Sequence, residues 1–191
     1  MQDTLPIHFA PLQGYTEAIY RNAHDAFFGR VDTYYTPFVR LEKGNFRRRD
    51  VRGIEPENNG VTHLIPQLIA SSAEKAEVIL SLFIEKGYQE VDINLGCPFP
   101  LLAKRHNGSG ILPYPEEVKA LLSIVTRYPQ ISFSVKMRLG WEQPDECLAL
   151  APILNDLPLR QITMHPRLGK QGYKGEVDLQ GFSAFYWQIR P

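Results

Sequence analysis

Hydrophobic and polar residues alternate along the chain with two different periods. A period of two is typical of a half-buried strand, whereas apolar residues three and four positions apart are typical of an amphipathic helix. The first pattern predicts strands at residues 7–10, 33–38, 63–68, 91–95, 131–139 and 161–165. The second predicts helices at residues 16–27, between 71 and 87, from 115 onward, at 144–154 and at 181–189. The polar residues 40–60 are expected to form a long loop.

Two of the expected helices carry capping signals at their first turn. Thr16 stands where an N-cap residue would begin the first helix. Ser71 and Glu74 have the spacing of a capping box, and Gly87 follows the last apolar residues of that helix. Both helices therefore have a defined start in the sequence.

The repeated strand–helix unit predicts an α/β fold with parallel strands and right-handed crossovers. An open doubly wound sheet and a (β/α)8 barrel both fit this alternation. No Gly-x-Gly-x-x-Gly motif follows the first strand, and polar residues gather after the strand ends, as at the catalytic face of a barrel. The chain has 191 residues and about six strand–helix units, whereas a full barrel usually takes about 250 residues. We therefore expect residues 1–191 to form one domain, an incomplete TIM barrel.

Composition narrows the class of protein. Hydrophobic residues make up 43% of the chain, which indicates a globular protein. No apolar run approaches the roughly 20 residues of a membrane span, and the N-terminus lacks the basic and apolar segments of an export signal. Cys97 and Cys147 are therefore expected as reduced thiols in the cytoplasm.

The charge distribution is uneven although the formal net charge is zero. Global charge therefore gives no argument for a nucleic-acid partner. Basic residues gather in two segments, either of which could contact phosphates or simply form a solvated surface. The first contains Arg40, Lys43, Arg47, Arg48, Arg49 and Arg52, and the second contains Lys104, Arg105 and His106.

The most informative segment runs from residue 91 to residue 98. Its apolar residues alternate with Asp92 and Asn94, and Gly96 and Pro98 then end the strand on either side of Cys97. A thiol at the mouth of a strand, three residues after an inward-facing amide, suits proton-transfer chemistry. The alternative is that Cys97 is a small buried hydrophobic residue, as free cysteines usually are.

The strand at residues 131–139 gives the second strong signal. Lys136 and Arg138 share one face with two serines, and the other face is apolar. If the apolar face packs against helices, the two cations point into the barrel, where they need anionic or electron-rich partners. The pyrimidine edge of a reduced flavin would be such a partner. The alternative is an edge strand whose polar face lies in water.

Three further features are weaker signals. His165 ends the sixth strand, where it could donate to a cofactor or bond to a neighbouring backbone group. Gln67 could read a flavin edge with both a donor and an acceptor. Residues 107–110 permit close backbone approach to a ligand, although a flexible surface turn is the more common use of such a segment. The sequence has no metal-binding, P-loop or nucleophile-elbow motif, so we expect no metal.

Taken together, these segments resemble the tRNA-dihydrouridine synthase family. The N-x-G-C-P and V-K-x-R-x-G-W elements are highly specific in combination, and the order and spacing agree from about residue 7 to residue 178. The matching segments are residues 10–16 (APLQGYT), 66–68 (PQL), 92–98 (DINLGCP), 107–110 (NGSG), 135–141 (VKMRLGW), 164–167 (MHPR) and 171–175 (QGYKG).

The resemblance implies a flavin-dependent barrel enzyme that reduces uridines of tRNA to dihydrouridine, with FMN as cofactor and NADPH as the reductant of the flavin. It implies Cys97 as the general acid that protonates uracil C5 while hydride goes to C6. Asn94 would help to place the uracil, and Arg138 and Arg167 would contact the flavin or the RNA. The residues implied to line FMN are Pro11, Leu12, Gln67, Lys136 and His165.

The family's glycine-rich phosphate-binding segments and its helical RNA-binding domain have no counterpart in this sequence. We therefore expect a truncated barrel, or one completed by a partner, whose open sheet edges could bring two copies together. Two other functions stay open. One is a flavin barrel that acts on a free pyrimidine, similar to dihydroorotate dehydrogenases. The other is a noncatalytic fragment that binds RNA or a protein partner without flavin.

Overall fold

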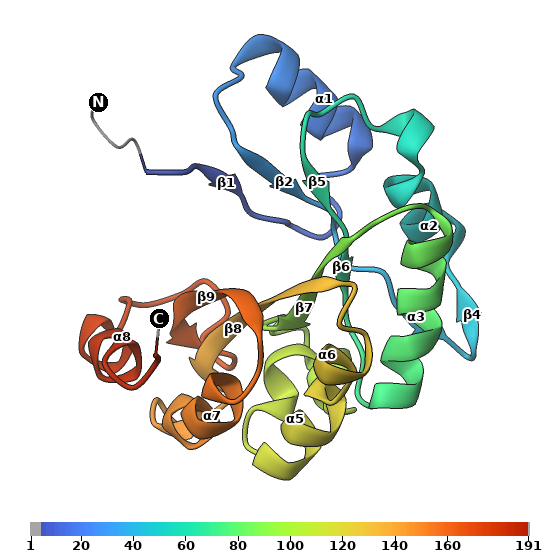
Figure 1. Cartoon of the computed structure of the whole chain (residues 1–191). Coiled ribbons are helices and arrows are strands. Elements are labelled where there is room, and N and C mark those ends of the chain that lie inside the picture. The colour runs from blue at the N-terminus through green and yellow to red at the C-terminus, as the bar shows by residue number, and fades with distance from the viewer. Residues whose placement is uncertain (1–4, 191) are drawn as a thin grey trace.

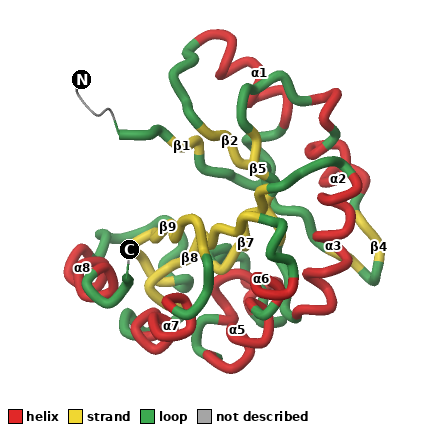
Figure 2. The backbone as a smooth tube through the Cα atoms, viewed as in Figure 1, coloured by secondary structure: helices red, strands yellow, loops and turns green. Residues whose placement is uncertain are grey.

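The computed structural model describes residues 5–190 and shows parallel strands with helices along their outer side (Figures 1 and 2). Three short strands pair in the order β1 (His8–Phe9), β2 (Thr33–Tyr35) and β5 (Leu64–Ile65). Four strands pair in the order β6 (Gln67–Leu68), β7 (Glu90–Leu95), β8 (Ser132–Gly140) and β9 (Leu159–Leu168). The N-terminal residues searched for an export signal lie outside the described range.

The two sheets follow one another around a single curve. A parallel bridge from Val39 to Leu68 joins the segment after β2 to the second sheet. The prediction of one strand at residues 63–68 is wrong, because that segment is divided at Pro66 into β5 and β6. A proline has no N–H to give to a sheet ladder, so the strand changes partner there. β5 pairs with β2, and β6 pairs with β7.

The predicted α/β class and partial barrel are confirmed. Every pair among the strands of the two sheets is parallel, as strand–helix repeats require. Within residues 5–190, β1 pairs only with β2 and β9 pairs only with β8, so the sheet does not close into a complete barrel. The open side faces the two ends of the chain in Figure 1.

The hydrophobic core lies between β6–β9 and the helices outside them. The apolar residues of β7 and β8 are fully buried there, as the period-two pattern predicts. The main covering helices are α3 (Ala73–Glu85), α5 (Pro115–Leu122), α6 (Ile124–Arg127) and α7 (Glu146–Asn155), and α8 (Leu179–Tyr186) follows β9. Because this packing occupies the outer face, the polar residues of the same strands point inward. None of the helices in the described range is long and apolar enough to cross a membrane.

Both predicted helix caps are displaced. The first helix, α1 (Ala18–Phe27), begins two residues beyond Thr16, whose hydroxyl instead exchanges hydrogen bonds with the backbone of Leu12. The N-cap of α3 is Ser72, whose hydroxyl accepts from the Lys75 backbone N–H. Ser71 has the competing role of accepting a hydrogen bond from the Lys75 ammonium, so the predicted capping box is wrong by one residue.

The prediction of a long loop at residues 40–60 is wrong. A small hairpin of β3 (Leu41–Glu42) and β4 (Asn45–Phe46) leads into α2 (Arg48–Ile54) and a 3₁₀ turn at Pro56–Asn58. Although arginines dominate the sequence of α2, this helix has a buried side, on which Asp50 is 7% exposed and Ile54 is 0% exposed. Arg21, fully buried on α1, donates to the Gly53 carbonyl at 2.8 Å and fastens the end of α2.

Candidate active site

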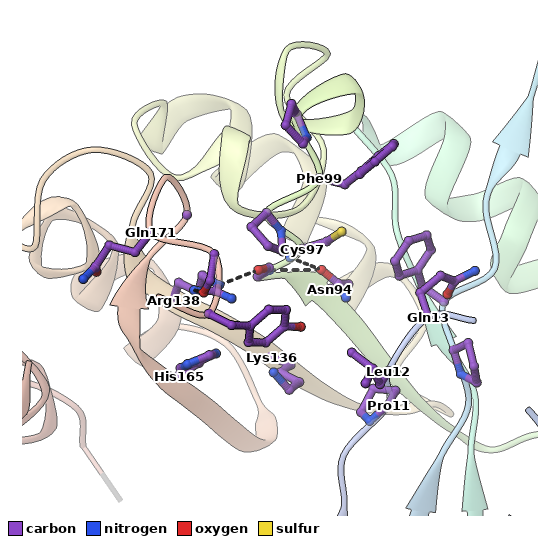
Figure 3. A pocket seen from close by; sticks show the side chains of 18 of the residues that line it. Pro11, Leu12, Gln13, Asn94, Cys97, Phe99, Lys136, Arg138, His165 and Gln171 are labelled. Atoms are coloured by element: carbon purple, nitrogen blue, oxygen red, sulfur yellow. Dashed lines mark hydrogen bonds between the residues drawn. The ribbon is translucent and has the colours of Figure 1, made fainter. Parts of the chain in front are cut away.

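A cavity of about 810 Å³ opens at the carboxyl ends of the strands. In Figure 3, Pro11 and Leu12 lie on one side of it, and Lys136 and His165 lie on the other. The structure brings together eight of the nine residues predicted for the site, from five separate segments of the chain. Those that line the cavity are Pro11, Leu12, Gln67, Asn94, Cys97, Lys136, Arg138 and His165.

Strand register explains why these side chains meet. Asn94 of β7 is paired with Lys136 of β8, and Arg138 of β8 is paired with His165 of β9. Residues paired in this way present their side chains on the same face of a sheet. The prediction that the β8 cations point into the barrel is therefore confirmed. The edge-strand alternative is wrong, because β8 is hydrogen-bonded to strands on both sides.

Cys97 lies two residues beyond β7 and is partly exposed to the cavity. Burial raises the pKa of its thiol, and the Phe99 backbone N–H and the charge of Arg138 oppose that shift. The group is therefore a protonated thiol at neutral pH, the state that a proton donor needs. Cys147 differs, since it is fully buried in α7 and its pKa is raised to about 12.

Residues 107–110 support the Cys97 loop and are not a flexible surface turn. They lead into the short 3₁₀ helix Gly108–Ile111, which is buried. The backbone N–H and the hydroxyl of Ser109 both donate to the Cys97 carbonyl at 3.0 Å. A Cβ at Gly108 would lie 2.6 Å from the same carbonyl oxygen, and its φ of +60° also favours glycine.

The amide of Asn94 is committed to the loop that follows it. Its Oδ1 accepts from the backbone N–H groups of Gly96 at 3.0 Å and Cys97 at 2.8 Å. Its Nδ2 donates to Oε1 of Gln67 at 2.7 Å. Asn94 therefore has one N–H left for a ligand and no free carbonyl oxygen.

Gln67 is likewise left with one donor. Its Oε1 accepts from Asn94, and its Nε2 donates to Oδ2 of Asp92 at 2.6 Å. One N–H and the second lone pair of Oε1 are left for a molecule in the cavity. The interpretation that Gln67 reads a flavin edge with both a donor and an acceptor stays a prediction.

Lys136 of β8 lies directly opposite Asn94 of β7 in the sheet. Burial lowers the pKa of its ammonium, and the charge of Asp92 opposes that shift. An ammonium in such surroundings stabilises negative charge on a bound molecule more strongly than it would in water.

Arg138 fixes the ends of three strands. Its Nε donates to the Gly96 carbonyl at 2.9 Å, and one terminal nitrogen donates to the carbonyls of Leu168 at 3.0 Å and Gly172 at 2.7 Å. The guanidinium carbon also lies 5.5 Å from the ring centre of Tyr173. Arg138 is 2% exposed, so most of its hydrogen-bonding capacity maintains the shape of the cavity.

His165 is a neutral donor toward the cavity. Burial, followed by the charges of Arg138, Lys136 and Arg167, lowers its pKa to about 4. Arg167 has only donors, and its terminal nitrogen lies 3.1 Å from Nε2 of His165. Nε2 therefore accepts and Nδ1 carries the proton. Arg167 is not among the residues that line the cavity, and its predicted contact with flavin or RNA stays a prediction.

The first basic segment is partly neutralised. Arg40 and Arg47 lie 3.6 and 3.7 Å from the carboxylate of Glu42, and Arg49 lies 3.9 Å from that of Glu17. Arg48 and Arg52 of α2 are exposed. In the second segment, His106 is within 2.7 Å of Glu117 and stacks on Tyr114. Residues 5–190 contain no group of three side chains placed to hold a metal ion.

The model of the dihydrouridine synthase (Dus) family matches residues 8–185. The chain belongs to this family. It is 28% identical to the probable tRNA-dihydrouridine synthase 1 of Synechocystis over 177 residues, which cover 90% of this chain and 48% of the relative. It is 31% identical to tRNA-dihydrouridine synthase B of Vibrio cholerae over 120 residues, 62% of this chain and 35% of the relative. It is also 28% identical to the tRNA-dihydrouridine(16) synthase of Haemophilus ducreyi over 180 residues, 89% of this chain and 54% of the relative.

The chain spans about half the length, or less, of the curated relatives it matches. Its site contains participants that sequence reasoning missed. One of them is Asp92, which shares the inner face of its strand with Asn94. The period-two pattern of this strand is the sequence signal that identifies it. Ser109 was overlooked because its contact with Cys97 spans 12 positions of the chain. Tyr173 and Trp141 also line the cavity, and they stand in loops without a periodic pattern.

Proposed function

We propose that this member of the family reduces uridine in tRNA to 5,6-dihydrouridine, with FMN as cofactor and NADPH as reductant. The observation that carries the proposal is the juxtaposition of the Cys97 thiol and the Lys136 ammonium at one cavity. The relatives are described as tRNA-dihydrouridine synthases, and the chain matches them across the segments that supply this cavity.

The polar side of the cavity suits the edge of a flavin. Gln67 and Asn94 each have a single free N–H, His165 has Nδ1–H, and Lys136 has an ammonium. These groups are all donors, and they suit the acceptors N1, O2, O4 and N5 of a flavin edge, while the N3–H of that edge needs an acceptor. The opposite side is apolar, with Pro11, Leu12 and Phe38 available to the flat ring. When bound, FMN supplies the hydride for the reduction.

The residues of the chain then have distinct tasks. The Cys97 thiol holds the proton for C5 of the uracil, and its raised pKa keeps that proton in place at neutral pH. Asn94 holds the backbone of the Cys97 loop through two N–H groups. Lys136 provides positive charge beside the reacting ring, and Arg138 keeps the ends of β7, β8 and β9 together.

The proposed substrate needs room for a single base outside its stack. Removing a uridine from a tRNA stack costs roughly a few kcal/mol, which contacts with the RNA backbone must offset. Arg48 and Arg52 on α2 and Lys104 and Arg105 after α4 (Pro100–Ala103) are exposed and available to phosphates. These four cations are the proposed backbone contacts.

NADPH oxidation by the FMN-loaded chain tests the proposal. We expect unmodified tRNA to stimulate oxidation and to acquire dihydrouridine, and we expect free orotate to do neither. Stimulation by orotate alone would indicate a free-pyrimidine reductase. A chain that binds tRNA but takes up no FMN would show that the noncatalytic alternative is correct.

A further inference from the structure

The proposed reaction leaves the buried carboxylate beside the cavity, Asp92, without a task. Asp92 is 2% exposed on the inner face of β7, behind the residues that line the cavity. Its Oδ1 accepts from the Ser134 hydroxyl at 2.5 Å, and its Oδ2 accepts from Nε2 of Gln67 at 2.6 Å. A buried carboxylate is costly unless it is hydrogen-bonded or paired with a cation, so the partners of Asp92 indicate what it does.

The hydrogen bonds from the Cys97 loop to Asp92 run in one direction only. The backbone N–H groups of Gly96 and Cys97 can only donate, so the atom of Asn94 that faces them is the oxygen. The Asn94 nitrogen then faces Gln67 and donates, so the Gln67 atom on that side must be the oxygen, which accepts. The Gln67 nitrogen consequently faces Asp92, where only an acceptor completes the chain. The backbone therefore settles the orientation of both amides.

We infer that Asp92 is a positioning residue, which sets the orientation of the Gln67 and Asn94 amides and thereby holds the loop that presents Cys97. The inference rests on the proposed function, because it is that reaction which requires a fixed thiol. The same chain of bonds decides that Gln67 and Asn94 offer donors to the cavity. Without an acceptor at position 92, the Gln67 N–H that faces it loses its partner, and the Gln67 amide is no longer held in the orientation that accepts from Asn94.

The charge of Asp92 is separable from its role as acceptor. Burial raises the pKa of Asp92, the hydrogen bonds from Ser134 and Gln67 oppose that shift, and the nearby Lys136 does so as well. In Asp92→Asn the new carbonyl can still accept from Gln67, while its N–H₂ donates to the Ser134 hydroxyl, which can rotate. Asp92→Leu has a similar size but no acceptor. The two variants therefore distinguish acceptor from charge.

The rate at which iodoacetamide alkylates Cys97 in the full chain without cofactor measures how firmly the loop is held. Peptide mass spectrometry separates Cys97 from the buried Cys147. We expect Asp92→Leu to speed alkylation of Cys97 at least about fivefold, because a buried donor is left without a partner. Asp92→Asn and the control Ser134→Ala, which leaves the Gln67 contact intact, should stay within about twofold of the wild type. Equal rates in Asp92→Leu and Ser134→Ala would overturn the inference.

A second pair of variants decides the matter if Asp92→Leu does not fold. Gln67→Glu places two carboxylates face to face, which removes the donor to Asp92 once the pair no longer shares a proton, so alkylation is measured up to about pH 9. Gln67→Glu should therefore speed alkylation at least about fivefold, and adding Asp92→Asn should restore the rate to within about twofold by supplying a donor. A double variant that stays as fast as Gln67→Glu would refute the chain of bonds. A merely structural role for Asp92 predicts no such rescue.

Amide hydrogen exchange of Gly96 and Cys97 supplies an independent readout. Asp92→Leu should speed exchange at these two amides and leave the core strand β8 unchanged, whereas uniform acceleration would mean global destabilisation and contradict the inference. Both measurements are made without FMN, NADPH or tRNA. A failure here is therefore distinct from a failure of the proposed reaction, which NADPH oxidation reports.

Discussion

The two sides of the cavity are built in different ways. The polar side comes from β6–β9, where β8 and β9 have nine and ten residues and are paired along most of their length. The apolar side comes from loops after β1 and β2, which have two and three residues. The side chains of Gln67, Asn94, Arg138 and His165 are held by hydrogen bonds, whereas Leu12 is 40% exposed. Except for Gln67 on the two-residue strand β6, the directional polar groups thus lie on or directly after the longer strands, and adaptable ring contact comes from loops after the short ones.

The largest expected effect on FMN affinity comes from the ammonium on the polar side. Lys136→Met keeps the length of the side chain and removes its charge, so we expect FMN affinity to fall about tenfold to a hundredfold. Quenching of flavin fluorescence on binding measures this affinity. Lys119→Met, on the exposed side of α5, is the matched control and should leave the affinity unchanged. Equal affinities for the wild type and Lys136→Met would mean that the ring edge lies elsewhere.

Arg167 gives an intermediate effect through His165. Arg167→Met removes the donor to Nε2 and one of the charges that hold the pKa of His165 at about 4. We expect that pKa to rise in an NMR titration and FMN affinity to fall about threefold to tenfold. Arg105→Met, an exposed substitution in the second basic segment, should change neither quantity. An unchanged pKa of His165 in Arg167→Met would mean that Arg167 does not influence the protonation of His165.

The same histidine predicts a pH dependence of stability. Its pKa is about 4 in the folded chain, below the ordinary value of about 6.5 expected when unfolded. The unfolded chain therefore binds more protons between these values, and stability falls as the pH drops through this range. In His165→Gln, thermal unfolding should lose part of this slope between about pH 6.5 and pH 4. An identical slope in both proteins would mean that other groups cause it.

The smallest effect is expected on the apolar side. Leu12→Ala removes ring contact from a partly exposed position, so FMN affinity should fall only about twofold to fivefold. Leu5→Ala, at a residue that is 88% exposed, is the control and should have no effect. A loss from Leu12→Ala as large as that from Lys136→Met would reverse the comparison between the two sides.

The long strands were the part of the fold that the sequence predicted best. In β8 the alternation of apolar and polar residues identifies both faces, because one face is wholly buried and the other lines the cavity. The short strands were less predictable. The sequence pattern predicts one strand through Pro66, but β5 and β6 on either side of this proline belong to different sheets. α2 was missed because arginines dominate a helix whose buried side is small.

The site residues could be named from the sequence, but their hydrogen-bond directions could not. The resemblance supplied Gln67 and Asn94, yet the donors that they present follow from the backbone N–H groups of Gly96 and Cys97. That information depends on the register of β6 and β7, which pair residues 25 positions apart. The contact of Arg167 with His165 is easier to predict from the sequence, because residues two apart share a face of a strand.

The central claim is that Cys97 donates the proton to uracil C5 at a cavity that holds FMN independently of it. Single-turnover reduction of unmodified tRNA by wild type and Cys97→Ala, with FMN affinity measured on the same preparations, tests it most directly. We predict that Cys97→Ala binds FMN like the wild type and forms dihydrouridine about a hundredfold to ten-thousandfold more slowly. Dihydrouridine formation at the wild-type rate in Cys97→Ala, with FMN bound, would contradict the claim.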